Sequence, residues 1–150
     1  MKIRKLDQHE IPPMGLMLLA DPSQMLVSKY LERGECYVME NNNQIIGVYI
    51  LVPTSTDKIE LANLAVEKAL QGNGIGKMLV LNSIERAKMV GYKMMEIGTG
   101  NSSIGQLALY QKCGFRITHV DRNFFIRHYD TPIYENGIWC RDMIRLSQEL

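Results

Sequence analysis

The segment 71–77, which reads Gln-Gly-Asn-Gly-Ile-Gly-Lys, contains the residues whose types and spacing point most directly to chemistry. Glycines at 72, 74 and 76 place no Cβ at every second position, so a bulky anion can approach the main chain. The first N–H groups of a helix have no acceptor within the helix, and the helix dipole gives them partial positive charge. A glycine-rich turn that begins a helix therefore predicts a phosphate site.

The elements around this turn suit that purpose. Residues 59–66 are nearly all apolar, which predicts a central strand covered on both faces. Residues 75–90 form the longest helical pattern in the chain, and Gly91 is a typical residue at a helix end because it tolerates positive φ. A strand, a turn and a helix in this order would hold a phosphate compound at the start of the helix.

The rest of the chain predicts a mixed α/β fold in one domain, residues 1–150, because no linker divides it. We expect strands at 2–6, 36–40, 45–52, 58–66, 93–97, 115–120 and 141–146. We expect helices at 11–20, 24–32, 75–90 and 104–112. The last two strands are separated by a long polar and aromatic insertion.

Composition excludes several classes of protein. A net charge of +1 argues against nucleic acid as the main partner, and no apolar run is long enough for a signal peptide or a membrane span. Cys36, Cys113 and Cys140 are odd in number and lack the spacing of metal ligands. We therefore expect no metal, no membrane, and reduced thiols in a cytoplasmic protein.

Two common glycine-rich motifs fit the turn poorly. A Walker loop needs glycine where Gln71 stands and a hydroxyl where Met78 stands. A dinucleotide-binding turn needs its third glycine one residue later, and it follows a strand near the N-terminus rather than a hairpin. The phosphate compound therefore has to be identified by another pattern.

Gln71, Gly74 and Gly76 satisfy the pattern Gln/Arg-x-x-Gly-x-Gly/Ala, which resembles the acetyl-CoA-binding signature of the GNAT acetyltransferase superfamily. About thirty residues further on, residues 109–115 read Leu-Tyr-Gln-Lys-Cys-Gly-Phe and match a second family phrase, Leu-Tyr-x-Lys-x-Gly-Phe. The resemblance covers nearly the whole chain. It implies the GNAT acyl-CoA N-acyltransferase fold, with a central, mostly antiparallel sheet of about six to seven strands and about four flanking helices.

The resemblance also implies a reaction and a cofactor site. The acetyl group of acetyl-CoA, a co-substrate, would pass to a primary amine of a small molecule or protein by direct attack in a ternary complex. Main-chain amides would bind the pyrophosphate, and they belong to Gln71, Gly72, Asn73, Gly74, Ile75, Gly76 and Lys77. Leu64, Ala65 and Val66 would pair with the pantetheine arm, and an N–H near Ala65 or Val66 would polarise the thioester carbonyl.

Two catalytic residues are expected from the same resemblance. An amine with a pKa of roughly 10 is protonated at pH 7 and must lose a proton, for which Glu60 is the best candidate. The alternatives are that Glu60 faces solvent at a strand end, or that a water chain takes the proton. Tyr110 matches the tyrosine that protonates the departing sulfur, although a tyrosine can also simply pack at a helix end.

Three further residues have open roles. Asn63 could hold a water or bond a bulged backbone. Strict alternation puts it opposite Glu60, and a bulge would bring both to one face. Ser103 stands seven residues before Tyr110, where relatives often carry an asparagine. Either Asn101 takes over that contact with the pantetheine arm, or the contact is lost.

The insertion at 121–139 is rich in aromatic and acidic residues. These are Phe124, Phe125, His128, Tyr129, Tyr134 and Trp139, with Asp121, Asp130 and Glu135. Such side chains would suit a cationic amine, or they pack the loop, or they form a contact in a possible homodimer. His128 is a second candidate base. The sequence leaves the acceptor open, and a non-catalytic acyl-CoA-binding regulatory domain is the alternative function.

Overall fold

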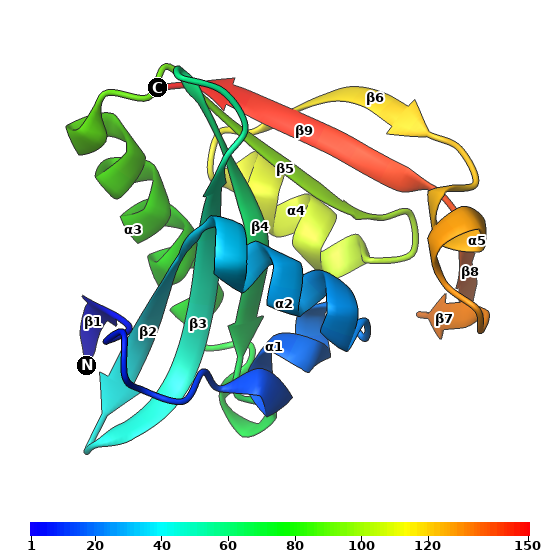
Figure 1. Cartoon of the computed structure of the whole chain (residues 1–150). Helices are drawn as coiled ribbons and strands as arrows, with labels where there is room; N and C mark the ends of the chain where they lie inside the picture. The colour runs from blue at the N-terminus through cyan, green and yellow to red at the C-terminus, as the bar shows by residue number, and fades with distance from the viewer.

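The computed structural model describes residues 1–150 as one sheet of seven strands with helices on both faces (Figure 1). The strands lie in the order β1 (Lys2–Lys5), β2 (Glu35–Asn41), β3 (Gln44–Pro53), β4 (Lys58–Val66), β5 (Met94–Gly100), β9 (Met143–Glu149) and β6 (Arg116–Asp121). A separate hairpin pairs β7 (Ile133–Glu135) with β8 (Ile138–Cys140). All neighbours are antiparallel except β4 and β5. The predicted mixed, mostly antiparallel sheet is confirmed.

The five α-helices are α1 (Met14–Ala20), α2 (Gln24–Arg33), α3 (Ile75–Val90), α4 (Ile104–Lys112) and α5 (Phe124–His128), and a short 3-10 helix η1 (Lys68–Leu70) precedes α3. None of these helices has both the length and the apolar character needed to cross a membrane.

The sheet separates two groups of buried side chains. Tyr49 and Leu61 lie in the larger group, which packs against α3 and α4. Val48 and Ile50 lie in the smaller one, which packs against α1 and α2. Successive residues of a strand point to opposite faces, so β3 contributes to both groups. A site formed around β4 can therefore use side chains from both faces of the sheet.

The central feature of the sheet is the divergence of β4 and β5 (Figure 1). Residues 58–61 of β4 pair with residues 94–97 of β5, and nothing after Leu61 pairs across this boundary. β4 nevertheless continues to Val66 and β5 to Gly100, where β5 is still bonded to β9 on its other side. The two central strands consequently separate after Leu61, and we call the unpaired region between them the slot.

A β-bulge lies next to this slot. In the pairing of β3 with β4, Ile50 is opposite Asn63 and Leu51 is opposite Leu61, which leaves Ala62 without a partner. The extra residue reverses the alternation along β4. Glu60 and Asn63 therefore share the face that carries α1 and α2, as the bulge hypothesis requires.

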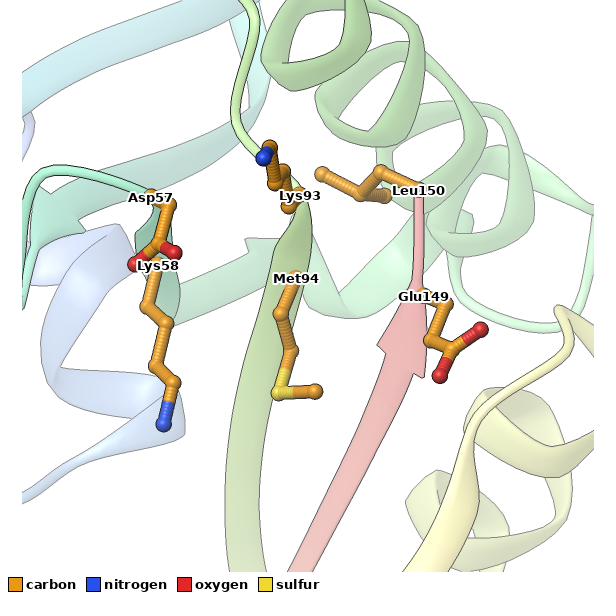
Figure 2. A pocket seen from close by; sticks show the side chains of 6 residues that line it. All are labelled: Asp57, Lys58, Lys93, Met94, Glu149 and Leu150. Atoms are coloured by element: carbon orange, nitrogen blue, oxygen red, sulfur yellow. The ribbon is translucent and has the colours of Figure 1, made fainter.

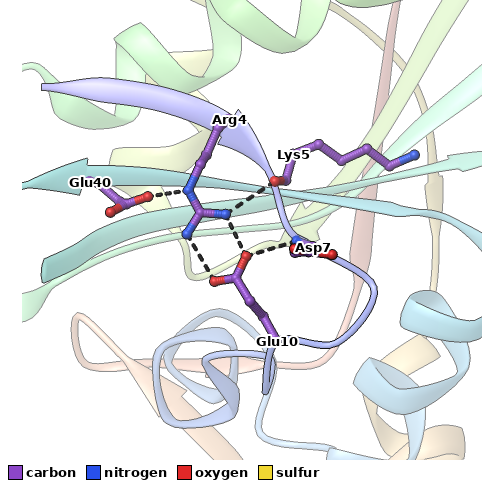
Figure 3. A network of polar contacts seen from close by, with 5 residues as sticks. All are labelled: Arg4, Lys5, Asp7, Glu10 and Glu40. Atoms are coloured by element: carbon purple, nitrogen blue, oxygen red, sulfur yellow. Dashed lines mark hydrogen bonds and ion pairs between the residues drawn. The ribbon is translucent and has the colours of Figure 1, made fainter. Parts of the chain in front are cut away.

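A network of hydrogen bonds and ion pairs holds β1 in place. The Arg4 guanidinium donates to both carboxylate oxygens of Glu10, at 2.5 and 2.8 Å, and to Glu40 of β2 (Figure 3). Glu10 Oε1 also accepts from the Asp7 N–H at 2.8 Å. The network ties β1 to the segment that leads into α1.

Several elements differ from the sequence prediction, among them β5, which runs over Met94–Gly100 rather than 93–97. The first helix begins at Met14 rather than Ile11. Ile11 and Pro12 each precede a proline, and a residue in that position avoids the helical conformation. The last strand runs over Met143–Glu149 rather than 141–146. The insertion contains α5 and the β7–β8 hairpin, which the sequence analysis did not predict. Long-range bonds hold α5, as when the Phe125 N–H donates to Arg141 O.

Candidate active site

The loop before α3 presents a row of free main-chain donors. The first helical bond runs from the Met78 N–H to Gly74 O, and the six N–H groups of residues 72–77 donate to no acceptor in the chain. Gly72 and Gly74 both have a φ of 83°, which favours glycine, and a Cβ on either would meet nothing within 4 Å. The loop is therefore an open cradle for an anion at a helix start.

The other predicted loop residues have different tasks. The Gln71 N–H already donates to Lys68 O at 3.4 Å, and its side-chain Nε2 donates to Val66 O at 3.1 Å. A Cβ on Gly76 would lie 3.4 Å from Leu109 Cδ2, so this glycine lies between α3 and α4 rather than facing the open cradle. Gln71 thus shapes the loop and Gly76 allows α3 and α4 to approach, while the free amides are those of residues 72–77, Gly76 included.

The open edge of β4 offers main-chain groups to the slot. The Glu67 N–H donates to Ile46 O at 2.8 Å, which marks this pair as hydrogen-bonded. Hydrogen-bonded and non-hydrogen-bonded pairs alternate in antiparallel strands. The main-chain N–H and C=O of Ala65 therefore point towards β3, whereas those of Leu64 and Val66 point towards the slot. Leu64 and Val66 are consequently the residues that can pair with an extended ligand.

Tyr110 lies on the α3 and α4 side of the sheet. Its side chain is buried, and its ring packs edge-on against Phe115 with centroids 6.2 Å apart. Burial raises the pKa of its hydroxyl above the ordinary value of 10. The hydroxyl therefore keeps its proton at neutral pH.

Glu60 lies on the other face, beside the beginning of the slot. Its carboxylate is 23% exposed and lies 3.4 Å from Arg145 Nη1. The Arg145 side chain reaches it across Gly98 of β5, where a Cβ would lie 2.6 Å from the same nitrogen. Tyr30 of α2 is close by: burial first, and then the charges of Asp21 and Glu60, raise its pKa to about 12.

Asn63 has an unsatisfied acceptor on this face. It is 4% exposed, and its Nδ2 donates to Met17 O at 3.1 Å, which sets the orientation of the amide. Its Oδ1 is buried without a hydrogen-bond partner in the chain. Such an atom costs about 1–3 kcal/mol unless a ligand or water bonds to it.

Asn101 and Ser103 are used within the chain. Asn101 Oδ1 accepts from the N–H groups of Arg141 and Asp142, at 2.8 and 3.0 Å, and its Nδ2 donates to Trp139 O. Ser103 Oγ donates to Glu135 Oε1 at 2.9 Å. Both side chains hold the insertion, and their contact with the pantetheine arm stays a prediction.

The aromatic residues of the insertion mostly pack on one another. Phe124 contacts Phe125 and His128, and the Phe125 and Tyr129 rings lie 5.4 Å apart. The Tyr129 hydroxyl donates to Asp21 Oδ1 at 2.7 Å, across to the junction of α1 and α2. Phe124, Phe125, His128 and Tyr129 thus pack the insertion, which is one of the three roles that the sequence left open. The hydrogen bond of Tyr129 also brings the insertion to the face that carries Glu60.

The sequence analysis missed four contributors to this face, namely Asp21, Tyr30, Gly98 and Arg145. A glycine inside a strand indicates that another group approaches the backbone closely, so Gly98 could have predicted such a contact. Nothing local marked Arg145, because its partner is 85 residues away. No three His, Cys, Asp or Glu side chains lie close enough together to hold a metal ion.

A concavity of about 380 Å³ at the closed end of the sheet is not part of the site. It is lined by Asp57, Lys58, Lys93, Met94, Glu149 and Leu150. The charged ends of Lys58 and Glu149 point away from each other (Figure 2). Because its polar groups do not converge, this concavity lacks the arrangement that a reaction would need.

Together, the features above define a class of protein. An anion cradle and a protonated phenol lie on one side of the sheet, a carboxylate lies on the other side, and β4 and β5 diverge between them. A family model described as the acetyltransferase (GNAT) domain matches residues 32–117. The chain belongs to the GNAT family.

Individual relatives are closely similar. The uncharacterized N-acetyltransferase YvbK of Bacillus subtilis (strain 168) is 57% identical over 135 residues, which cover 90% of this chain and 87% of YvbK. A GNAT family acetyltransferase from Elizabethkingia anophelis, with acetyl-CoA bound, has a TM-score of 0.97 at 49% identity and covers 99% of this chain and 97% of its own. IAA acetyltransferase from Bacillus cereus ATCC 14579 has a TM-score of 0.95 at 50% identity, covering 99% of both chains.

These relatives confirm the predicted family, fold and co-substrate. The chain is an acetyl-CoA-dependent N-acetyltransferase. The names of the relatives and the bound acetyl-CoA favour the enzyme over the non-catalytic acyl-CoA-binding domain.

Proposed function

We propose that the chain moves the acetyl group of acetyl-CoA to a primary amine of a small molecule or protein, by direct attack in a ternary complex. The slot between β4 and β5 carries this proposal. The cradle and Tyr110 lie on one side of the sheet, and Glu60 and Asn63 lie on the other. Cofactor and acceptor can then reach the thioester from opposite faces, without a covalent enzyme intermediate.

The cofactor site is made mainly of backbone. The free amides of residues 72–77 bind the pyrophosphate, and the exposed Lys77 adds a positive charge. The slot-facing groups of Leu64 and Val66 pair with the pantetheine arm. One of their N–H groups donates to the thioester oxygen, where negative charge develops during attack.

Proton transfer on the acceptor side begins the reaction. Glu60 takes a proton from the ammonium form of the acceptor, directly or through a water that donates to Asn63 Oδ1. The orphaned Asn63 Oδ1 supports the second route, because it needs a donor. The neutral nitrogen then bonds to the acetyl carbon as the carbonyl electron pair moves to oxygen, and the nitrogen, now positively charged, loses its second proton to solvent.

Loss of the sulfur completes the transfer. The carbon–sulfur bond breaks and its electron pair stays on the sulfur of CoA. Tyr110 gives its hydroxyl proton to this thiolate, and solvent restores the phenol. The buried, protonated state of Tyr110 supports this role.

The acceptor face favours a cation. Asp21, Tyr30, Glu60 and Tyr129 bring carboxylates and aromatic rings to the side of the sheet that carries α1 and α2, and Arg145 neutralises only Glu60. Carboxylate pairing and cation–π contact both attract an ammonium group. We infer an acceptor with at least one further positive charge near the reacting amine.

Thiol release from acetyl-CoA tests the proposal. Polyamines, basic amino acids, peptides with free N-termini and IAA, the compound in the name of the Bacillus cereus relative, form the panel. We expect a cationic amine to stimulate release, and Glu60→Gln to lower kcat by about a hundredfold or more. Glu96, opposite Glu60 in the register of β4 and β5, provides the matched variant Glu96→Gln.

Two results would contradict the proposal. Thiol release that no amine stimulates, in a chain that binds CoA, would refute the transfer to amines. A larger loss of kcat in Glu96→Gln than in Glu60→Gln would show that the base is wrongly assigned.

A further inference from the structure

A second cavity, of about 310 Å³, lies on the α3 side of the sheet at the end where β4 begins. It is lined by Arg33, Gly34, Glu35, Tyr37, Leu51, Pro53, Ile59, Arg86, Ala87, Val90 and Tyr92. Arg86 follows the first residue of α3 by eleven positions, which is roughly 16 Å along the helix. The cavity is thus separate from the anion cradle, and no residue of the proposed reaction lines it.

The floor of this cavity is apolar. Leu51, Ile59 and Ala87 belong to the buried core, and Tyr37 is stacked on Tyr49 with ring centroids 5.0 Å apart. Small-molecule sites in proteins measure about 300–1,000 Å³, so this cavity fits a compound of about one ring. A phosphorylated nucleotide would be too large and too polar for it.

The Arg86 guanidinium is held in place and only partly used. It lies 4.3 Å from the centroid of the Tyr37 ring, and its Nε donates to Asn82 Oδ1 at 3.0 Å. Asn82 is itself fixed by the Tyr49 hydroxyl, which donates to the same oxygen at 2.6 Å. No carboxylate forms an ion pair with Arg86, so its guanidinium charge can meet an anionic ligand.

The charge balance at the cavity favours an anion. Arg33 forms no ion pair in the chain, as is also true of Arg86. The Glu35 carboxylate is already engaged by Lys5 Nζ at 3.3 Å and by the Tyr37 hydroxyl at 2.7 Å. Two guanidinium groups therefore remain without a carboxylate partner beside an apolar floor.

We propose that this cavity binds a small aromatic carboxylate, with the ring on the Leu51, Ile59 and Ala87 floor and the carboxylate on the Arg86 guanidinium. A guanidinium presents two parallel N–H donors that match a carboxylate, and this geometry selects a planar anion over a neutral amide. Arg33 adds a second positive charge at the mouth. Such a ligand would bind at the same time as acetyl-CoA.

Calorimetric titration of the full chain tests this site, with saturating CoA present so that the anion cradle is blocked. The probes are phenylacetate, its neutral isostere phenylacetamide, and acetate, which lacks the ring. We expect saturable 1:1 binding of phenylacetate and at least about tenfold weaker binding of the other two. Arg86→Gln and Arg33→Gln should each weaken phenylacetate binding by about fivefold or more, and Arg116→Gln, on β6, should leave it unchanged.

Three outcomes would overturn the proposal. They are the absence of saturable phenylacetate binding, equal binding of phenylacetamide, and loss of phenylacetate binding when CoA is added. The comparison with phenylacetamide uses the unaltered chain, so it decides the question even if Arg86→Gln does not fold. Undiminished phenylacetate binding in a folded Arg86→Gln variant would also contradict it.

Discussion

Alanine substitutions at Gly74 and Gly76 separate the two tasks of the glycine-rich loop. Gly74 has a φ of 83°, and a left-handed conformation costs an alanine roughly 1–2 kcal/mol. A Cβ there would meet nothing within 4 Å, so the cost comes from the backbone alone. We expect Gly74→Ala to lower the free energy of unfolding by about 1–2 kcal/mol.

Gly76 has the opposite balance. It lies inside α3, where alanine is favoured over glycine by about 1 kcal/mol, and its Cβ would make an ordinary contact, 3.4 Å from Leu109 Cδ2. Gly76→Ala should therefore leave the free energy of unfolding unchanged or raise it by up to about 1 kcal/mol. Each variant adds one methyl group, and the two positions are only two residues apart.

The affinity for CoA should also differ between Gly74→Ala and Gly76→Ala. A relaxed φ at residue 74 turns the neighbouring N–H groups away from the anion, and one lost bond to a charged group costs about 1.5–3 kcal/mol. Gly74→Ala should weaken CoA binding by about tenfold or more in a calorimetric titration, and Gly76→Ala should change it little. Urea unfolding gives the stabilities. A Gly74→Ala variant that matches the unaltered chain in both measurements would refute the reasoning.

Three further predictions concern Tyr110, Gly98 and Glu10. Tyr110→Phe keeps the ring that packs on Phe115, so steady-state kinetics should show kcat falling by about a hundredfold with the CoA affinity nearly unchanged; unchanged turnover across pH would exclude the proton donor. In Gly98→Ala the added Cβ would lie 2.6 Å from Arg145 Nη1 and 2.7 Å from Met143 Sδ, so a crystal structure should show Arg145 displaced from Glu60; an intact pair would contradict this. The Arg4 hydrogen bonds, helped by the Asp7 N–H, lower the pKa of Glu10 from 4.5 to about 2, so its stabilisation is complete above pH 4.5 and is lost as pH falls towards 2. The Tm difference between the unaltered chain and Glu10→Gln should accordingly shrink below pH 4.5, and a constant difference would argue against the network.

Local patterns predicted the parts of the site that depend on neighbouring residues. Gln71, Gly72 and Gly74 could be recognised because a helix start and its turn are set by residues close in sequence. The role of Tyr110 is predicted from the phrase at residues 109–115, which also ends a helix. The bulge at Ala62 was only a possibility in the sequence, because its position depends on the register with β3.

The rest of the site depends on contacts between distant segments. The slot exists because β5 stays with β9 while β4 stays with β3, which no local pattern encodes. The Asn101 amide bonds the main chain near Trp139, some forty residues later, and no local pattern encodes that contact either. Long-range hydrogen bonds of this kind have no sequence signature, and the same is true of Arg145 reaching Glu60.

The most direct test of the central claim is the amide spectrum of the 15N-labelled chain with CoA and, separately, with pantetheine. We predict that CoA shifts the N–H resonances of residues 72–77 together with those of Leu64 and Val66. Pantetheine, which lacks the pyrophosphate, should shift only Leu64 and Val66 strongly. CoA shifts that leave residues 72–77 unmoved, or that gather instead around Arg86 and Tyr37, would contradict the account.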